Sequence, residues 1–145
     1  MALWGGRFAQ GPEDSVFALS RSVHFDWRLA PYDLRSSMAH LAVLRKSGLV
    51  AAADADAILI GLKELTQEVA TGSFAANDSD EDVHSALERG LTEKLGAIGG
   101  SLRAGRSRND QVTTDLRLFS IDHMLEIATL LTHLQTAILQ KAAAY

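Results

Sequence analysis

Cysteine is absent from the 145-residue sequence, and proline occurs only at positions 12 and 31. The lack of cysteine excludes disulfides, thiolate nucleophiles and cysteine-based zinc sites. From residue 32 onward the chain has no helix-breaking proline. Alanine and leucine outnumber the β-branched and aromatic residues that favour strands. This composition predicts an all-α protein.

Long apolar runs and a strong excess of one charge are also lacking. No stretch approaches the roughly 18 apolar residues that cross a bilayer, and the first residues do not have the pattern of a secretory signal. The net charge is −4, so any anion site must be a local cluster that opposes the overall charge. We expect neither a membrane nor a nucleic-acid partner. A chain without cysteine fits a reducing compartment, so the expected location is cytoplasmic.

Apolar residues at helical spacing predict five helices. These cover approximately residues 13–21, 33–47, 54–70, 79–95 and 110–145. The last is long, since about 35 residues at about 1.5 Å each give a rod of roughly 50 Å. Most of its circumference is apolar, and four shorter helices cannot cover it. The rod therefore needs partner helices, either from further sequence or from other subunits.

Short polar residues predict where the helices begin. Residues 24–31 are expected to form a loop, and Asp33 and Asp54 are expected to cap the second and third helices. Ser79 and Asp82 have the spacing of a capping box at the start of the fourth. Each of these residues can satisfy a backbone N–H group that the first turn of a helix leaves without a partner.

Residues 105–110 read Gly-Arg-Ser-Arg-Asn-Asp and follow a further arginine, Arg103. The glycine allows a tight turn, and the run ends where the long helix begins, so free N–H groups point towards it. Guanidinium groups bind carboxylates through two parallel hydrogen bonds. The run therefore predicts a site for a small polycarboxylate. The alternative is a solvated basic loop with an ordinary asparagine cap, and spacing alone leaves both open.

His84 and Glu88 are four residues apart and share a helix face. Two ligands do not make a metal site, so no metal is expected. The pair could form a hydrogen bond between helices. Alternatively, His84 could carry a proton or orient a group near the arginine run.

Three strings, taken in this order, are specific. They occupy residues 3–8, 79–84 and 105–112, and together they resemble the argininosuccinate lyases of the fumarase/aspartase superfamily, which also contains the delta-crystallins of eye lenses. The third string is highly specific for this family. The resemblance spans the chain from Leu3 into the long helix.

The resemblance implies a fold and an activity. An N-terminal helical domain over residues 1–108 would be followed, over residues 109–145, by the first long helix of a central helical bundle. The family forms homotetramers and uses no cofactor. It converts argininosuccinate into arginine and fumarate by reversible β-elimination, a reaction of arginine biosynthesis.

The resemblance also implies roles for residues. Ser22, Ser107, Arg108 and Asn109 match positions that bind the substrate, and His84 matches a histidine near the active site. Arg106 and Asp82 are further candidates.

The family's catalytic residues, including a serine on a mobile loop, lie beyond Tyr145, so residues 1–145 alone are expected to be an inactive N-terminal part. Arg103 and Ala104 stand where many members have histidine and threonine, which puts the substrate contacts on that side in doubt. Two alternatives remain. One is a non-enzymatic, crystallin-like or interaction module of the same lineage, and the other is a different superfamily lyase such as adenylosuccinate lyase.

Overall fold

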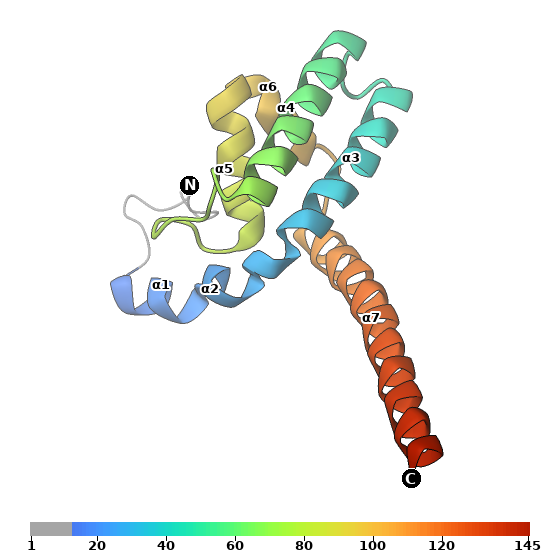
Figure 1. The fold of residues 1–145 in the computed structure, drawn as a ribbon. Coiled ribbons are helices and arrows are strands. Elements are labelled where there is room, and N and C mark those ends of the chain that lie inside the picture. Colours follow the sequence, from blue (N-terminus) through green and yellow to red (C-terminus); the bar gives the residue numbers. More distant parts are fainter. Residues whose placement is uncertain (1–12) are drawn as a thin grey trace.

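The computed structural model describes residues 13–145, which are almost entirely helical and contain no strand within that range. The expected all-α class is therefore confirmed. Figure 1 shows a bundle of helices from which one long helix projects. The helices are α1 (Asp14–Ser20), α2 (Val23–Asp26), α3 (Ala30–Lys46), α4 (Ala52–Thr71), α5 (Val83–Leu95), α6 (Ala97–Gly100) and α7 (Arg108–Ala144), with 3-10 turns η1 (Trp27–Leu29) and η2 (Ser101–Arg103). The string at residues 3–8 lies outside the described residues.

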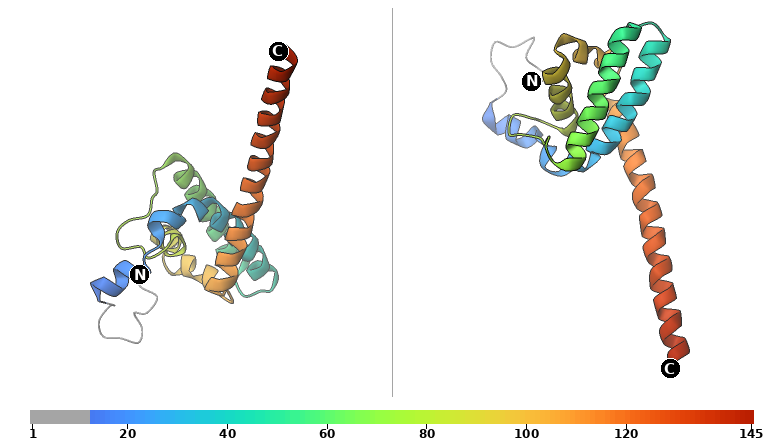
Figure 2. Two further views of the ribbon diagram at one scale, coloured as in Figure 1. Left: turned by 90° about the horizontal axis from the view of Figure 1, so that it is seen from below. Right: turned by 45° about the horizontal axis from the view of Figure 1, so that its top comes forward.

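The core lies between α3, α4 and α5. α3 and α4 form an antiparallel pair, and α5 packs against both (Figures 1 and 2). Leucine, isoleucine and valine at helical spacing bury one face of each helix, which removes apolar surface from water and stabilises the bundle. The largest buried apolar side chains are those of Leu34, Leu44, Ile58, Leu65, Leu91 and Val83.

The prediction of a loop over residues 24–31 is wrong. α2 and η1 run directly into α3, which begins at Ala30. Pro31 occupies the first turn of α3, where a missing N–H group costs nothing because that turn has no intrahelical acceptor for it. Asp33 is therefore not a cap. It lies inside the helix, and its side chain is buried.

The predicted capping box at Ser79 is also wrong, because α5 begins later. Asp82 is the N-cap: its carboxylate accepts a hydrogen bond from the Ser85 backbone N–H at 2.6 Å. The Ser85 hydroxyl in turn accepts from the Asp82 backbone N–H at 3.0 Å. Ser79 instead donates its hydroxyl to Asn77 at 2.7 Å, in the turn before the helix. The fourth predicted helix is thus confirmed, but with its box shifted by three residues.

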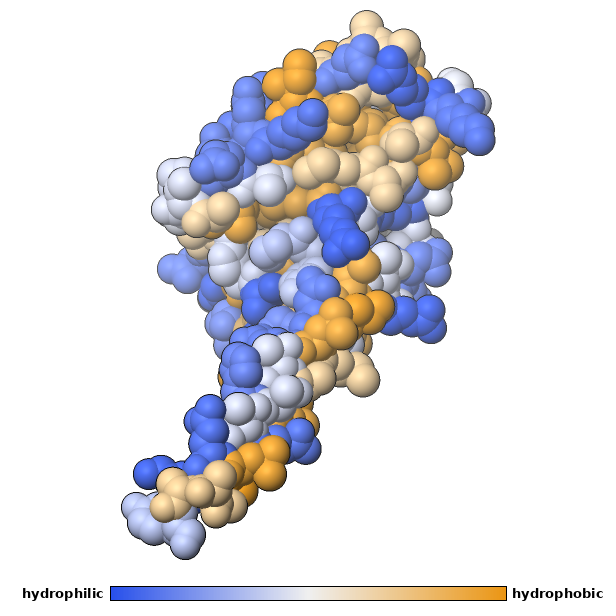
Figure 3. All heavy atoms as spheres, turned by 45° about the vertical axis from the view of Figure 1, so that its right-hand side comes forward, coloured by the Kyte–Doolittle hydropathy of each residue, from blue (hydrophilic) through white to orange (hydrophobic). Residues whose placement is uncertain are grey.

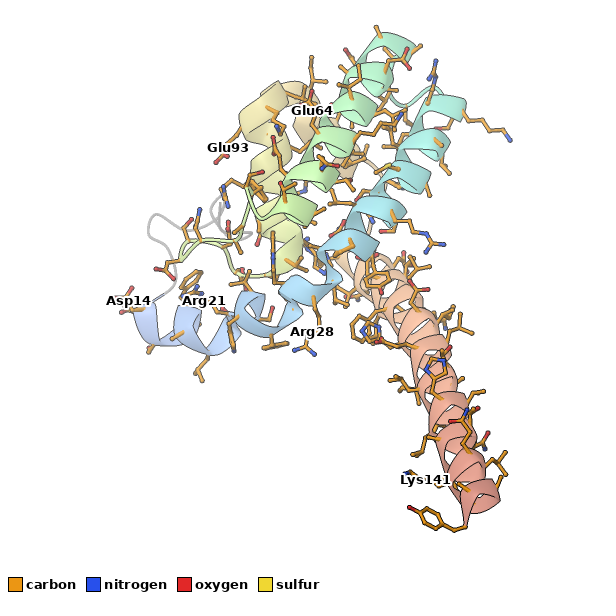
Figure 4. The ribbon with its side chains drawn as sticks, in the orientation of Figure 1. Asp14, Arg21, Arg28, Glu64, Glu93 and Lys141 are labelled. Carbon is orange, nitrogen blue, oxygen red and sulfur yellow. The ribbon has the colours of Figure 1, made fainter. Side chains whose placement is uncertain are left out.

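The long predicted helix is confirmed as α7, which has 37 residues. It begins two residues before the predicted start, and α4 begins two residues before its predicted cap at Asp54. The first turns of α7 contact the bundle, chiefly through α3 and η1 and also at the start of α5, and beyond residue 120 every side chain is exposed. Figure 4 shows side chains standing out along the helix as far as Lys141.

Large apolar side chains are exposed along α7, next to polar ones (Figure 3). They are Val112, Leu116, Ile121, Met124, Leu125, Ile127, Leu130, Leu131, Leu134, Ile138 and Leu139. Among the described residues, no helix combines the length and the hydropathy needed to cross a membrane.

Candidate functional site

The arginine run forms the turn that leads into α7. Gly105 has a φ of 63°, a left-handed conformation that favours glycine. Ser107 is the N-cap of α7, and its Oγ accepts a hydrogen bond from the Asn109 backbone N–H at 2.9 Å. The run therefore places Ser107, Arg108 and Asn109 at the positive end of a long helix. This is the arrangement that the sequence predicts for an anion site.

Arg106 points inward, away from that helix end. Its Nη1 donates to the Ser37 hydroxyl at 2.8 Å, and its Nη2 donates to the Ser36 hydroxyl at 2.9 Å, both on α3. Burial lowers the pKa of this guanidinium, and the charges of Asp33 and Asp115 oppose that effect. Arg106 thus has a structural role, because its two hydrogen bonds hold the run against α3.

Arg108 and Ser22 meet at the start of α5. The Arg108 Nε atom lies 3.9 Å from Asp82 Oδ2, and the Ser22 backbone N–H donates to the carbonyl of Glu81, the residue before Asp82, at 2.8 Å. The Ser22 hydroxyl donates to Asp26 at 2.5 Å. Three candidates from distant parts of the sequence, Ser22, Asp82 and Arg108, therefore gather around one helix end.

His84 does not pair with Glu88, which instead bonds Arg103 at 3.1 Å. The His84 Nδ1 lies 2.5 Å from Asp33 Oδ2 and 3.8 Å from Asp115 Oδ2. All three side chains are buried, with exposed fractions of 4%, 3% and 0%. Asp33 and Asp115 are functional candidates that the sequence pattern does not indicate. The pattern predicts Asp33 as a helix cap and predicts no role for Asp115.

Asp33 is well provided with donors. Besides His84, the Ser37 hydroxyl donates to its Oδ1 at 2.8 Å, and the Gln111 Nε2 donates to its Oδ2 at 2.7 Å. Burial raises the pKa of Asp33, but the hydrogen bonds from His84 and Ser37 and the charge of Arg106 outweigh it and hold the pKa below its usual value. Asp33 is therefore an ionised buried acceptor.

Asp115 has the opposite environment. Neither carboxylate oxygen has a hydrogen-bond partner among the described residues. Burial raises the pKa of Asp115 to about 6; the nearby Ser36 hydroxyl and the charge of Arg106 oppose this rise, whereas the negative charge of Asp33 adds to it. Burial disfavours the charged form of a carboxylate that has few donors. Asp115 therefore keeps its proton to a higher pH than Asp33, which has several donors.

The ligand atoms of Asp33, His84 and Asp115 lie within 4.8 Å of one another, which is a spacing that could suit a metal ion. The arrangement fits a hydrogen-bonded cluster better than a metal site. His84 and Asp33 are already at hydrogen-bonding distance, and the positive charge of Arg106 acts on both carboxylates. A further cation would meet that charge at close range.

A cavity of about 90 Å³ lies behind the arginine run. Its apolar walls come from α3, α4, α5 and η2, and its polar rim comes from the run and its neighbours. The apolar lining is Leu34, Leu62, Leu87, Leu91, Gly99 and Leu102, and the polar lining is Asp33, Ser37, His84, Glu88, Arg103, Arg106, Arg108 and Gln111.

Comparisons with known proteins agree on one family. The family described as "Lyase" matches residues 6–145. Argininosuccinate lyase of Frankia casuarinae is 57% identical over 138 residues, which are 95% of this chain and 30% of that protein. The argininosuccinate lyases of Nocardia farcinica and Corynebacterium jeikeium are 53% and 52% identical over 145 residues, which are 99% of this chain. The chain thus spans about 30% of the length of these curated relatives.

Proposed function

The chain belongs to the lyase family, and from that premise we propose that the protein containing it is an argininosuccinate lyase. The observation that carries the proposal is the 52–57% identity to proteins of that name along almost the whole chain. The proposed protein acts in arginine biosynthesis in the cytoplasm and needs no cofactor. We divide the chain into a helical domain over residues 1–108 and the start of a helical bundle over residues 109–145.

The proposed reaction is a β-elimination. A base removes the proton from the carbon next to one carboxylate of the substrate's succinyl part. The electron pair spreads onto that carboxylate and then forms the double bond of fumarate. The C–N bond breaks, and the guanidino nitrogen takes a proton from an acid and leaves as arginine. The step is fastest when fixed donors face the carboxylate on which negative charge develops.

The residues of this chain supply such donors. Arg108 has only the long contact with Asp82 among the described residues, so its guanidinium remains available for a two-pronged bond to a carboxylate. The Ser107 oxygen accepts from a backbone N–H, which leaves its hydroxyl proton free to donate. Asn109 is exposed at the same helix end. We assign Ser107, Arg108 and Asn109 to substrate binding.

Ser22 joins them in this proposal because it is bonded to the segment that precedes Asp82. His84 plays a different part. Its side chain is almost fully buried and bonded to Asp33. We therefore propose that His84 supports the residues of the site through Asp33 and does not exchange protons with the substrate. These residues form one wall of the site.

We also propose that the complete protein is a homotetramer assembled through α7. The support is the length of this helix and the band of exposed apolar side chains along it. A helix with so broad an apolar surface is stable in water when other helices cover it.

The proposal is tested by adding the complete protein to argininosuccinate, adenylosuccinate and aspartate in separate assays and following the ultraviolet absorbance of fumarate. We expect fumarate to be released from argininosuccinate and not from adenylosuccinate or aspartate. Release from adenylosuccinate or aspartate instead would assign the protein to another lyase of the superfamily. A folded protein that releases fumarate from none of the three would be a non-enzymatic relative.

A further inference from the structure

The arginine run lies over a cavity. The walls of that cavity are leucine side chains of α3, α4, α5 and η2, whereas Arg103, Arg106 and Arg108 border it on the side of the run. Close packing is what normally holds a segment in place in a protein interior. Here the cavity replaces part of that packing, so the place of the run depends on its polar contacts.

Those contacts converge on one side chain. Gln111, on the first turn of α7, donates its Nε2–H to Asp33 Oδ2 at 2.7 Å. At the other end of the run, Arg106 donates to the Ser37 hydroxyl, which itself donates to Asp33 Oδ1 at 2.8 Å. The two oxygens of Asp33 thus hold the residues that flank Ser107, Arg108 and Asn109 on either side.

We propose that Asp33 is a positioning residue for the carboxylate site, acting through Gln111 at one end of the run and through Ser37 and Arg106 at the other. The assignment rests on the proposed function, since it concerns the placing of Arg108 and Asn109 for a carboxylate substrate. The Asp33 side chain itself is buried.

A carboxylate suits this task because it accepts several hydrogen bonds at once, and bonds to a charged acceptor are stronger than neutral ones. The charged and titratable groups that face it are His84 from α5, Asp115 from α7 and Arg106 from the run. The positive charge of Arg106 acts on Asp33 and helps to keep it an ionised acceptor.

The direct test removes the Gln111 contact in the complete protein. Gln111→Leu keeps the size and the helix preference of the side chain but cannot donate. A displacement of about 1 Å at a site of this kind costs on the order of 100-fold in rate, so we expect kcat/KM for argininosuccinate to fall at least about 10-fold. The matched control is Gln67→Leu, which makes the same substitution at an exposed position on α4 and should leave kcat/KM unchanged.

A second variant separates positioning from general support of the fold. Gln111→Glu places a carboxyl group against Asp33. Near pH 8 the two negative charges repel, whereas near pH 5.5 the new group can hold a proton and donate it as Gln111 does. At each pH, kcat/KM of Gln111→Glu is divided by that of the unmodified protein. We expect this ratio to be at least about 10-fold higher near pH 5.5 than near pH 8. A constant ratio would overturn the proposal.

Hydrogen exchange provides a measurement that does not depend on activity. The backbone N–H groups of Arg106 and Asn109 are bonded to the Arg103 carbonyl and to the Ser107 hydroxyl. In Gln111→Leu they should exchange at least about 10-fold faster than in Gln67→Leu, while those of α5 stay unchanged. Unaltered exchange at both residues would refute the positioning role even if the unmodified protein proved to lack lyase activity. Lack of activity together with faster exchange would refute only the proposed function.

Discussion

The His84 Nδ1 lies 2.5 Å from the Asp33 Oδ2, and neither side chain has appreciable access to solvent. This contact joins α5 to α3 inside the bundle. It is a hydrogen bond to an ionised carboxylate, which is among the stronger polar contacts available to a protein. Removing His84 takes one donor from a buried carboxylate, which then keeps only Ser37 and Gln111.

His84→Ala should therefore destabilise the protein by about 3 kcal/mol, because it leaves Asp33 with one donor fewer and opens a small void. The free energy of unfolding in urea measures this loss. His133→Ala is the matched control, since His133 is exposed on α7 and its loss should cost almost nothing. A His84→Ala protein within about 1 kcal/mol of the control would show that the contact adds little.

Asp115 predicts a pH dependence. Its pKa is raised to about 6, above the value of 3.8 expected in the unfolded chain, because its burial disfavours the charge. The native state then binds more protons than the unfolded state between these values, so this group lowers stability as pH rises through about 4 to 6. Asp115→Asn mimics the protonated form. It should stabilise the protein at pH 8 by as much as about 3 kcal/mol and have little effect near pH 4.

Urea unfolding of the two proteins at both pH values measures this difference. Asp122→Asn, at an exposed position further along α7, is the matched control and should behave alike at the two pH values. If Asp115→Asn were less stable than the unmodified protein at pH 8, the buried carboxylate would be a stabilising charge, contrary to its raised pKa.

Arg108→Ala in the complete protein should lower kcat/KM for argininosuccinate at least about 100-fold, the loss typical of removing one donor to a developing negative charge. Stability should change by less than about 1 kcal/mol, because the only ion pair of Arg108 among the described residues is a long one. Steady-state kinetics and thermal unfolding measure the two effects. Arg35→Ala, at an exposed position on α3, serves as the control. If Arg108→Ala lost no more kcat/KM than Arg35→Ala, the run would be an ordinary basic loop.

The exposed stripe of Ile127, Leu131, Leu134 and Ile138 predicts association. Leu131→Glu combined with Leu134→Glu should reduce the mass of the complete protein in light scattering from that of four copies to that of smaller species, since buried charges without partners oppose assembly. The control, His133→Glu with Gln140→Glu, adds the same charge at two exposed polar positions of α7. An unchanged mass in the first variant would place the contacts between copies elsewhere.

The long helix and the turn that leads into it are predictable from sequence patterns, because both depend on local order. Gly105 and Ser107 set the turn and the cap within a few residues of Arg108, and a single string of residues holds that information. The apolar spacing of the other helices is local in the same way.

The buried cluster was not predictable in that manner. Asp33, His84 and Asp115 come from three helices, and an acid within a helix usually faces water. Its burial becomes visible only when the helices are packed. The caps at Asp33 and Ser79 failed for a similar reason. Both residues have the right chemistry, but Pro31 and Asp82 allowed the helices to begin elsewhere.

A small tilt of α7 at its base produces a large displacement at its far end. The helix is anchored near Gln111 and Asp115, which contact the bundle. The part beyond them is about 45 Å long at about 1.5 Å per residue. A tilt of about 5° at this base moves the far end of α7 by about 4 Å. Anything that clamps the far end therefore fixes the direction of the first turn to within a few degrees. Arg108 and Asn109 stand on that turn, so a contact at the far end of α7 would influence their orientation from tens of ångströms away.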